Sequence, residues 1–338
     1  MKYLIVTSIN APTRAMVELS NGAAVAGWKF VVIGDKKSPE NYDLPAADYY
    51  GLSRQNDLPF EYAQVCPTGH YARKNIGYLV AMCGRADEIM ETDDDNIPLD
   101  NFWAHRNVEQ RVRVSEQQGW VNIYAYFADQ LVWPRGYPLD LVKQEQKAIG
   151  EIPVRGICCP VHQGLADSNP DVDAVYRLLF DLPVRFRKAE SLAISGLASC
   201  PFNSQNTRWW PQAYPLMYLP YSCSFRMTDI WRSFVAQRIL LANGWGVLFH
   251  EATVYQERNE HDLMRDFADE IEGYRHNSNI MLSLLDLPLS GRPERMHDDI
   301  VMCYEKLVQL GLVGREELRL LAAWLRDCEA IACSTSVE

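Results

Sequence analysis

Residues 87–96 have the sequence Asp-Glu-Ile-Met-Glu-Thr-Asp-Asp-Asp-Asn. The first part, from Asp87 to Thr92, is short with apolar residues at its centre, which predicts a buried β-strand. It continues directly into three consecutive aspartates, Asp93 to Asp95. In open α/β sheets, ligands bind outside the carboxyl ends of the strands. We therefore expect a substrate site at this acidic turn.

The sequence before this turn alternates between strand patterns and helix patterns. Strands are predicted at residues 3–9, 28–33 and 49–52, and helices from residue 12 to about residue 19 and over residues 73–85. The second helix carries its apolar residues at helical spacing. Strands that alternate with helices favour a largely parallel sheet. The predicted fold class is therefore α/β, a mostly parallel sheet flanked by helices.

The second half of the chain is predicted to be richer in loops and helices. Residues 133–138 are turn-rich and exclude an ordinary helix. Residues 201–221 hold four prolines, two tryptophans and three tyrosines, which predicts an ordered loop or a segment that covers a ligand, rather than a linker. A helix is expected at 228–241, a strand at 245–255, and further helices at 298–310 and 315–330. We place a main domain at 1–275 and a helical appendage at 276–338.

Composition excludes several classes of protein. The 338 residues carry a net charge of −11 without a basic cluster, which argues against nucleic acid as a partner. No apolar run approaches the ~18 residues of a membrane span. The first residues lead straight into a strand rather than a signal peptide. The nine cysteines lack C-x-x-C spacing and fit free thiols. We expect a cytoplasmic protein, unless an upstream membrane anchor has been removed.

The acidic turn has a specific chemical use. A nucleotide diphosphate stays beside carboxylates only when a cation neutralises the charge, and Mg²⁺ or Mn²⁺ bridges one or two carboxylates to phosphates. Asp93 and Asp95 have the spacing for such a site. The alternative is a solvated turn or a helix cap. Three adjacent aspartates repel one another and need a compensating charge, which favours the metal.

Several longer stretches, in order along residues 2–270, make the chain resemble the STELLO family of glycosyltransferases. They are Val32–Lys37, Tyr71–Leu79, Glu91–Asn96, Trp133–Leu139, Gln163–Asp167, Pro170–Ala174, Phe225–Ser233 and Val254–Asp262. The resemblance implies a GT-A-like, Rossmann-related fold that uses a nucleotide-sugar donor. Such a set of matches is more specific than any single motif.

The resemblance also assigns candidate site residues. It implies that the donor is bound by Thr7, Asp35, Lys36, Arg73, Lys74, Asp93, Asp94, Arg135 and Gly136. It implies that Asp95 and His261 bind Mn²⁺ or Mg²⁺. Several of these residues have a plainer interpretation. Asp35 fits an ordinary turn after a strand, and His261 fits a surface histidine. Arg73 and Lys74 oppose the dipole of the helix that they begin, so a negative group should offset them.

Three further assignments concern catalysis and the acceptor. Asp229 is the candidate general base of an inverting transfer, with helix capping as the rival interpretation. Trp209 and Trp210 are candidates for stacking on a sugar ring, although such aromatics also form small cores. Asp171 is an acceptor contact or a helix cap.

The predicted function is transfer of a sugar from a nucleotide-diphosphate donor to a hydroxyl of a glycan or another acceptor. One alternative is a nucleotide-sugar mutase of the reversibly glycosylated polypeptide type, which also carries an Asp-Asp-Asp turn and would form an isomer without an acceptor. Another alternative is a scaffold that binds nucleotide sugar without turnover. Oligomer formation stays open.

Overall fold

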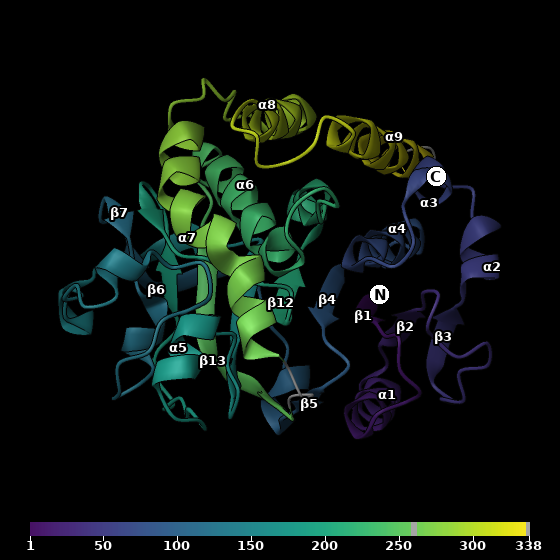
Figure 1. Cartoon of the computed structure of the whole chain (residues 1–338), viewed down its shortest axis with the longest axis horizontal. Helices are drawn as coiled ribbons and strands as arrows, with labels where there is room; N and C mark the ends of the chain where they lie inside the picture. The colour runs from purple at the N-terminus through teal and green to yellow at the C-terminus, as the bar shows by residue number, and fades with distance from the viewer. Residues whose placement is uncertain (258–261, 336–338) are drawn as a thin grey trace.

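A computed structural model describes residues 1–257 and 262–335 as a mixed α/β fold with a large central sheet flanked by helices (Figure 1). The sheet has the order β3-β2-β1-β4-β12-β9-β13-β10-β6-β8, and β5 pairs with β13. Its strands are β1 (Lys2–Thr7), β2 (Lys29–Ile33), β3 (Ala47–Tyr50), β4 (Glu88–Thr92), β5 (Asn96–Pro98), β6 (Glu109–Ser115), β8 (Val154–Cys158), β9 (Val161–Asp167), β10 (Leu192–Ile194), β12 (Asn206–Trp209) and β13 (Val247–Gln256).

The helices pack on this sheet and on one another. They are α1 (Arg14–Ala26), α2 (Leu52–Asn56), α3 (Glu61–Val65), α4 (Lys74–Cys83), α5 (Ala174–Leu179), α6 (Thr228–Ala242), α7 (Leu263–Leu285), α8 (Met296–Gln309) and α9 (Glu317–Thr335). Two short strands, β7 (Gly119–Trp120) and β11 (Ala198–Ser199), form a separate pair. No helix among the described residues is long and apolar enough to cross a membrane.

The N-terminal part of the sheet is parallel, as predicted. Strands β3, β2, β1 and β4 pair in parallel, and the central residues of β1, β2 and β4 are buried. Helices cover both faces of such a sheet, which explains the continuous apolar runs in the sequence. Gly77 allows α4 to approach closely, because a Cβ there would lie 2.6 Å from a side-chain atom of Ile5 and 3.0 Å from one of Ile33.

The remainder of the sheet is mixed. Strand β12 runs antiparallel to both β4 and β9, and β9 runs parallel to β13. Strands β4, β9 and β13 therefore point in one direction and end at the same edge of the sheet. The predicted loop at 201–221 is corrected here, since it contains β12. Its residues 206–209 become a strand by pairing with neighbours that are distant in sequence, which local turn residues did not indicate.

The C-terminal helices belong to the same hydrophobic core as the sheet. Leu307, Leu321 and Leu325 are buried in one cluster with residues of β1 and α4. Helices α8 and α9 lie along one edge of the molecule in Figure 1, where α9 meets α3 and α4. The sequence predicts a domain boundary between residues 275 and 276. Helix α7 continues across these two residues without a break.

Candidate active site

A cleft of about 520 Å³ opens at the carboxyl ends of β1, β2 and β4. Its volume is in the range of small-molecule and cofactor sites. Thr7 and Ile33 line it at the ends of β1 and β2, and all three aspartates of the acidic turn line it after β4. The predicted position of a substrate site beyond these strand ends therefore coincides with a cleft.

Asp94 is held by the loop that connects β1 to α1. Its Oδ2 accepts hydrogen bonds from Ser8 Oγ at 2.6 Å and from Asn10 Nδ2 at 3.2 Å. Its main-chain carbonyl accepts a short hydrogen bond from Thr13 Oγ1, the residue that caps α1. These contacts fix the centre of the acidic turn, so its two flanking aspartates have defined positions.

Asp93 has too little positive charge around it. Lys74 Nζ lies 3.4 Å from its Oδ1, and Tyr71 Oη donates to the same oxygen at 3.4 Å. Burial raises the pKa of the Asp93 carboxyl to about 7, and the Lys74 charge offsets this only in part. Three neighbouring carboxylates raise it further, those of Asp95, Asp229 and Asp94. Around Asp93, burial and negative neighbours therefore outweigh the positive charge of Lys74.

Asp95 is contacted by a residue at the end of β13, the strand that pairs with β5. Gln256, the last residue of β13, donates from Nε2 to both carboxylate oxygens of Asp95 at 3.0 Å each. Gln256 lines the cleft and is only 8% exposed. Its Oε1 is buried and has no hydrogen-bond partner among the described residues. Such an orphaned acceptor costs free energy unless a ligand reaches it.

The two cations at the start of α4 do not project into the cleft. Lys74 is fully buried and donates to Thr92 O at 2.8 Å and to Tyr71 Oη at 3.0 Å. Arg73 borders the cleft, but it donates to Gln55 Oε1 and to Cys66 O. We expected a negative group beside Arg73 and Lys74, because two cations at the start of α4 oppose its dipole. Protein oxygen atoms supply part of this compensation.

Asp35 ties two loops together at the end of β2. Its Oδ2 accepts from Gly69 N at 2.7 Å and His70 N at 3.1 Å, and its Oδ1 accepts from Lys36 N at 2.7 Å. It lines the cleft, as do the exposed Lys36 and Lys37. Asp35 therefore shapes the cleft even without direct contact to a ligand.

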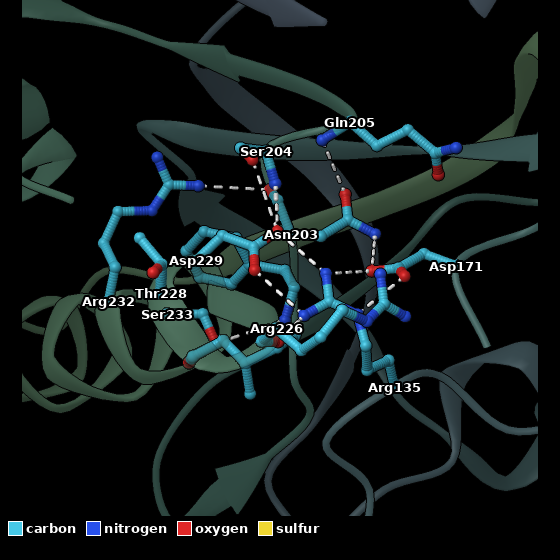
Figure 2. Close-up of polar contacts among 12 residues, drawn as sticks. Arg135, Asp171, Asn203, Ser204, Gln205, Arg226, Thr228, Asp229, Arg232 and Ser233 are labelled. Atoms are coloured by element: carbon cyan, nitrogen blue, oxygen red, sulfur yellow. Dashed lines mark hydrogen bonds and ion pairs between the residues drawn. The ribbon is translucent and has the colours of Figure 1, made fainter. Parts of the chain in front are cut away.

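Arg135 organises the opposite wall of the cleft (Figure 2). Its Nε and Nη2 donate to Asp171 at 2.7 and 2.8 Å, and its Nη1 and Nη2 donate to Asp229 at 3.0 Å each. A further short hydrogen bond runs from Nη1 to Arg226 O. A guanidinium has five N–H donors, and all five are used here. In this arrangement Arg135 has no donor left for a phosphate.

Asp229 is the charged partner that Arg135 stabilises. Burial raises the pKa of Asp229, but the adjacent Arg135 outweighs it, so the pKa falls to about 2. Ser204 adds hydrogen bonds from N and Oγ to Oδ2, both at 3.2 Å (Figure 2). Met227 is the N-cap of α6, which corrects the rival interpretation of Asp229 as that cap. The Asp229 side chain therefore lies in the wall of the cleft and does not cap the helix.

Two predicted sugar contacts are contradicted by burial. Trp209 is 0% exposed and donates from Nε1 to Glu91 at 2.8 Å. Trp210 is 8% exposed and packs against the ring of His162. Both faces of β12 are covered in the interior of the molecule, so neither indole lines the cleft. The aromatic side chains that do line it are Tyr71, His70 and Phe225, and Phe225 is 56% exposed.

The remaining assignments divide into three cases. Asp171 lines the cleft through its pairing with Arg135, and the Asp173 side chain is the cap of α5. Gly136 has a positive φ of 89°, and a Cβ there would meet Ile230 at 2.5 Å, so it serves packing of the wall on α6. His261 lies outside the described residues.

Sequence reasoning did not single out Gln256. A strand was predicted at residues 245–255, and Gln256 follows it directly. Because β13 runs in the same direction as β4, its carboxyl end meets the same edge of the sheet. The rule that located the aspartates could therefore have located Gln256, had the direction of β13 been known.

Comparison with known proteins agrees with the class of protein that the motifs predicted. Residues 226–336 match the family model of the STELLO glycosyltransferases. The resemblance that the motifs predicted is therefore confirmed by a family model over these residues.

Two relatives extend this similarity over nearly the whole chain. The chain is 26% identical to the probable glycosyltransferase STELLO2 of Arabidopsis thaliana, over 96% of this chain and 44% of the relative. It is also 26% identical to the probable glycosyltransferase STELLO1 of the same plant, over 98% of this chain and 44% of the relative. The chain thus spans less than half the length of these relatives.

Among solved structures, a mycobacterial protein matches with a TM-score of 0.43 and 11% identity, over 86% of this chain and 76% of that chain. Glucosyl-3-phosphoglycerate synthase of M. tuberculosis matches with a TM-score of 0.37 and 10% identity, over 86% and 82% of the two chains.

Proposed function

We propose that this chain is a divalent-metal-dependent glycosyltransferase that moves a sugar from a nucleotide-diphosphate donor to an acceptor hydroxyl with inversion at the sugar carbon. The family match and the cleft at the strand ends support the proposal. The observation that carries it is the position of three carboxylates, those of Asp93, Asp94 and Asp95, together in the cleft at the end of β4.

The residues of the turn fit a cation that is shared with a diphosphate. Within residues 1–257 and 262–335, no group of three His, Cys, Asp or Glu side chains is placed to hold an ion alone. Mg²⁺ and Mn²⁺ are commonly bound through one or two carboxylates, and the substrate phosphates and water complete the coordination. Asp93 and Asp95 would supply those carboxylates. When bound, the ion would act as a Lewis acid on the leaving diphosphate.

The residues around the turn would position the donor. Ser8 and Asn10 hold Asp94, so the turn keeps its shape in the absence of ligand. Lys36 and Lys37 are exposed at the rim and would offset phosphate charge. The nucleoside would lie along the ends of β1 and β2, where Thr7 and Asp35 line the cleft.

The wall around Arg135 would receive the acceptor. We keep Asp229 as the proposed base, because its carboxylate lines the cleft beside Asp171. A base with a pKa near 2 is a weak proton acceptor at neutral pH. Asp229 would therefore act best when the acceptor displaces part of the Arg135 pairing, since loss of that charge raises the pKa of Asp229.

Thermal-shift measurements with a panel of nucleoside diphosphates, each with and without Mn²⁺, test the donor site. Ligand that binds the native state raises the apparent stability by mass action. We expect stabilisation by one base type that requires Mn²⁺. Absence of any such stabilisation would contradict the proposal.

Turnover with the matching nucleotide sugars separates the related functions. Transfer to a hydroxyl acceptor, with inverted anomeric configuration in the product, supports the proposal. Formation of an isomeric nucleotide sugar without acceptor would identify a mutase. Binding without either product would identify a scaffold.

A further inference from the structure

The side chain of Gln256 combines two features that the donor site described above does not use. Its Nε2 donates to both oxygens of Asp95, while its Oε1 is buried without a partner among the described residues. Buried polar atoms in native proteins almost always have a partner. Leaving such an acceptor unpaired costs about 1–3 kcal/mol. The orphaned atom lies in a residue that lines the cleft, so a ligand can supply the missing partner.

The backbone holds Gln256 firmly against the acidic turn. Strand β13 pairs with β5 so that Gln256 stands opposite Asn96, and Glu257 N donates to Asp95 O at 3.0 Å. The two segments are therefore joined by main-chain hydrogen bonds on either side of the carboxylate. The Gln256 side chain does not need a loop movement to remain beside Asp95.

An amide oxygen is a hard, uncharged ligand of the type that Mg²⁺, Mn²⁺ and Ca²⁺ accept. Asp93, Asp94 and Asp95 already place three mutually repelling carboxylates in this part of the cleft. A neutral oxygen ligand adds a donor to a cation without adding to this repulsion. Without a bound cation, a glutamine at this position therefore destabilises the turn less than a fourth carboxylate would.

We infer that Gln256 is a further ligand of the divalent cation, contributing its amide oxygen beside the Asp95 carboxylate. The inference rests on the proposed function, because it assigns a residue to the same cation. The third protein donor is an amide, which comes from the end of β13.

The test measures Mn²⁺ affinity of the full chain by isothermal titration calorimetry, with Mn²⁺ alone and with Mn²⁺ plus the nucleoside diphosphate that stabilises the wild type. Gln256→Leu removes both the oxygen and the donor to Asp95. Gln256→Glu restores oxygen ligands but not the donor. We expect Gln256→Leu to weaken Mn²⁺ binding by about 10- to 100-fold. Gln256→Glu should bind Mn²⁺ at least as tightly as the wild type.

The glutamate variant separates ligation from positioning. If Gln256 only orients Asp95 through Nε2, Gln256→Glu loses that hydrogen bond and binds Mn²⁺ as weakly as Gln256→Leu, which would overturn the inference. Wild-type affinity in Gln256→Leu would overturn it as well, and would leave an ordered water as the partner of Oε1. Should Gln256→Leu fail to fold, Gln256→Asn retracts the amide by one methylene and is expected to weaken Mn²⁺ binding.

A matched control is Gln205→Leu. Gln205 lines the same cleft and is equally buried, but its Nε2 donates to Asn96 instead of to an aspartate of the turn. Its Mn²⁺ affinity should equal that of the wild type, and a loss equal to that of Gln256→Leu would count against the inference. Wild-type protein that binds no Mn²⁺ with any nucleoside diphosphate would instead refute the proposed function. The two failures are therefore distinguishable.

Discussion

Asp93 and Asp229 line the same cleft, but the protein surrounds them with opposite charge. Asp93 stands among other carboxylates with Lys74 as its partial counter-charge, and its pKa is raised to about 7. Asp229 shares the fully bonded guanidinium of Arg135, and its pKa is lowered to about 2. The negative charge around Asp93 is only partly balanced, whereas a guanidinium pairs directly with Asp229.

This difference shows that residue type does not set the role of a carboxylate. Desolvation acts on both side chains in the same direction, and the neighbouring charges decide the outcome. The wall of Asp93 is suited to a positively charged ligand. The wall of Asp229 is suited to uncharged hydroxyl groups, because its charge is largely compensated within the protein.

Removing the turn's outer carboxylate should have the largest effect. We predict that Asp95→Ala abolishes Mn²⁺-dependent nucleotide binding while the fold survives, because the cation loses a charged ligand. Calorimetric titration and circular dichroism measure the two properties. Asp100→Ala, an exposed acidic residue outside the cleft, serves as the control. Undiminished Mn²⁺-dependent binding in folded Asp95→Ala would place the cation elsewhere.

On the opposite wall, Asp229→Asn should keep donor binding and lower turnover. Loss of a general base typically reduces the rate by about 10²–10⁴-fold. The amide preserves the shape and can still accept a hydrogen bond from Arg135. The rate constant and the donor affinity are measured separately. Near-normal turnover would assign Asp229 to wall structure alone, and a product with retained configuration would exclude the inverting mechanism.

Replacement of Arg135 removes the positive charge from that wall. Arg135→Met leaves the buried carboxylates of Asp171 and Asp229 without their counter-charge. Loss of one partner from a buried ion pair typically costs about 3–5 kcal/mol. We expect urea unfolding to show a loss of this size, and a smaller loss for Arg135→Lys, which keeps the charge but has fewer donors. A change below about 1 kcal/mol in Arg135→Met would contradict the assigned role.

The smallest predicted effect is a gain in folding stability rather than a loss. The raised pKa of Asp93 means that the folded protein binds a proton between about pH 3.9, the unfolded value, and pH 7. Stability should therefore fall as pH rises through this window. We predict that metal-free Asp93→Asn is more stable than the wild type at pH 8, by about 1 kcal/mol, because solvent screens this partly exposed group. Equal stability at pH 8 would show that Lys74 already balances Asp93.

Local patterns predicted the elements that hold the acidic turn. Strands β1, β2 and β4 and helix α4 fall within the predicted ranges, to within a few residues, because a buried parallel strand and an amphipathic helix each need a periodic apolar pattern. Strand β12 was missed, since its four residues lie in a proline-rich and aromatic stretch. Its conformation depends on pairing with β4 and β9.

The family resemblance and the aspartate turn followed from contiguous residues, and so did the position of the turn at the end of a strand. The partners of each aspartate did not. Arg135 is 94 residues from Asp229 in the chain, and Gln256 is 161 residues from Asp95. Charge compensation acts over a few ångströms in space, irrespective of separation along the chain. Only the folded sheet, which brings the ends of β4 and β13 to one edge, determines which charged and polar groups surround each carboxylate.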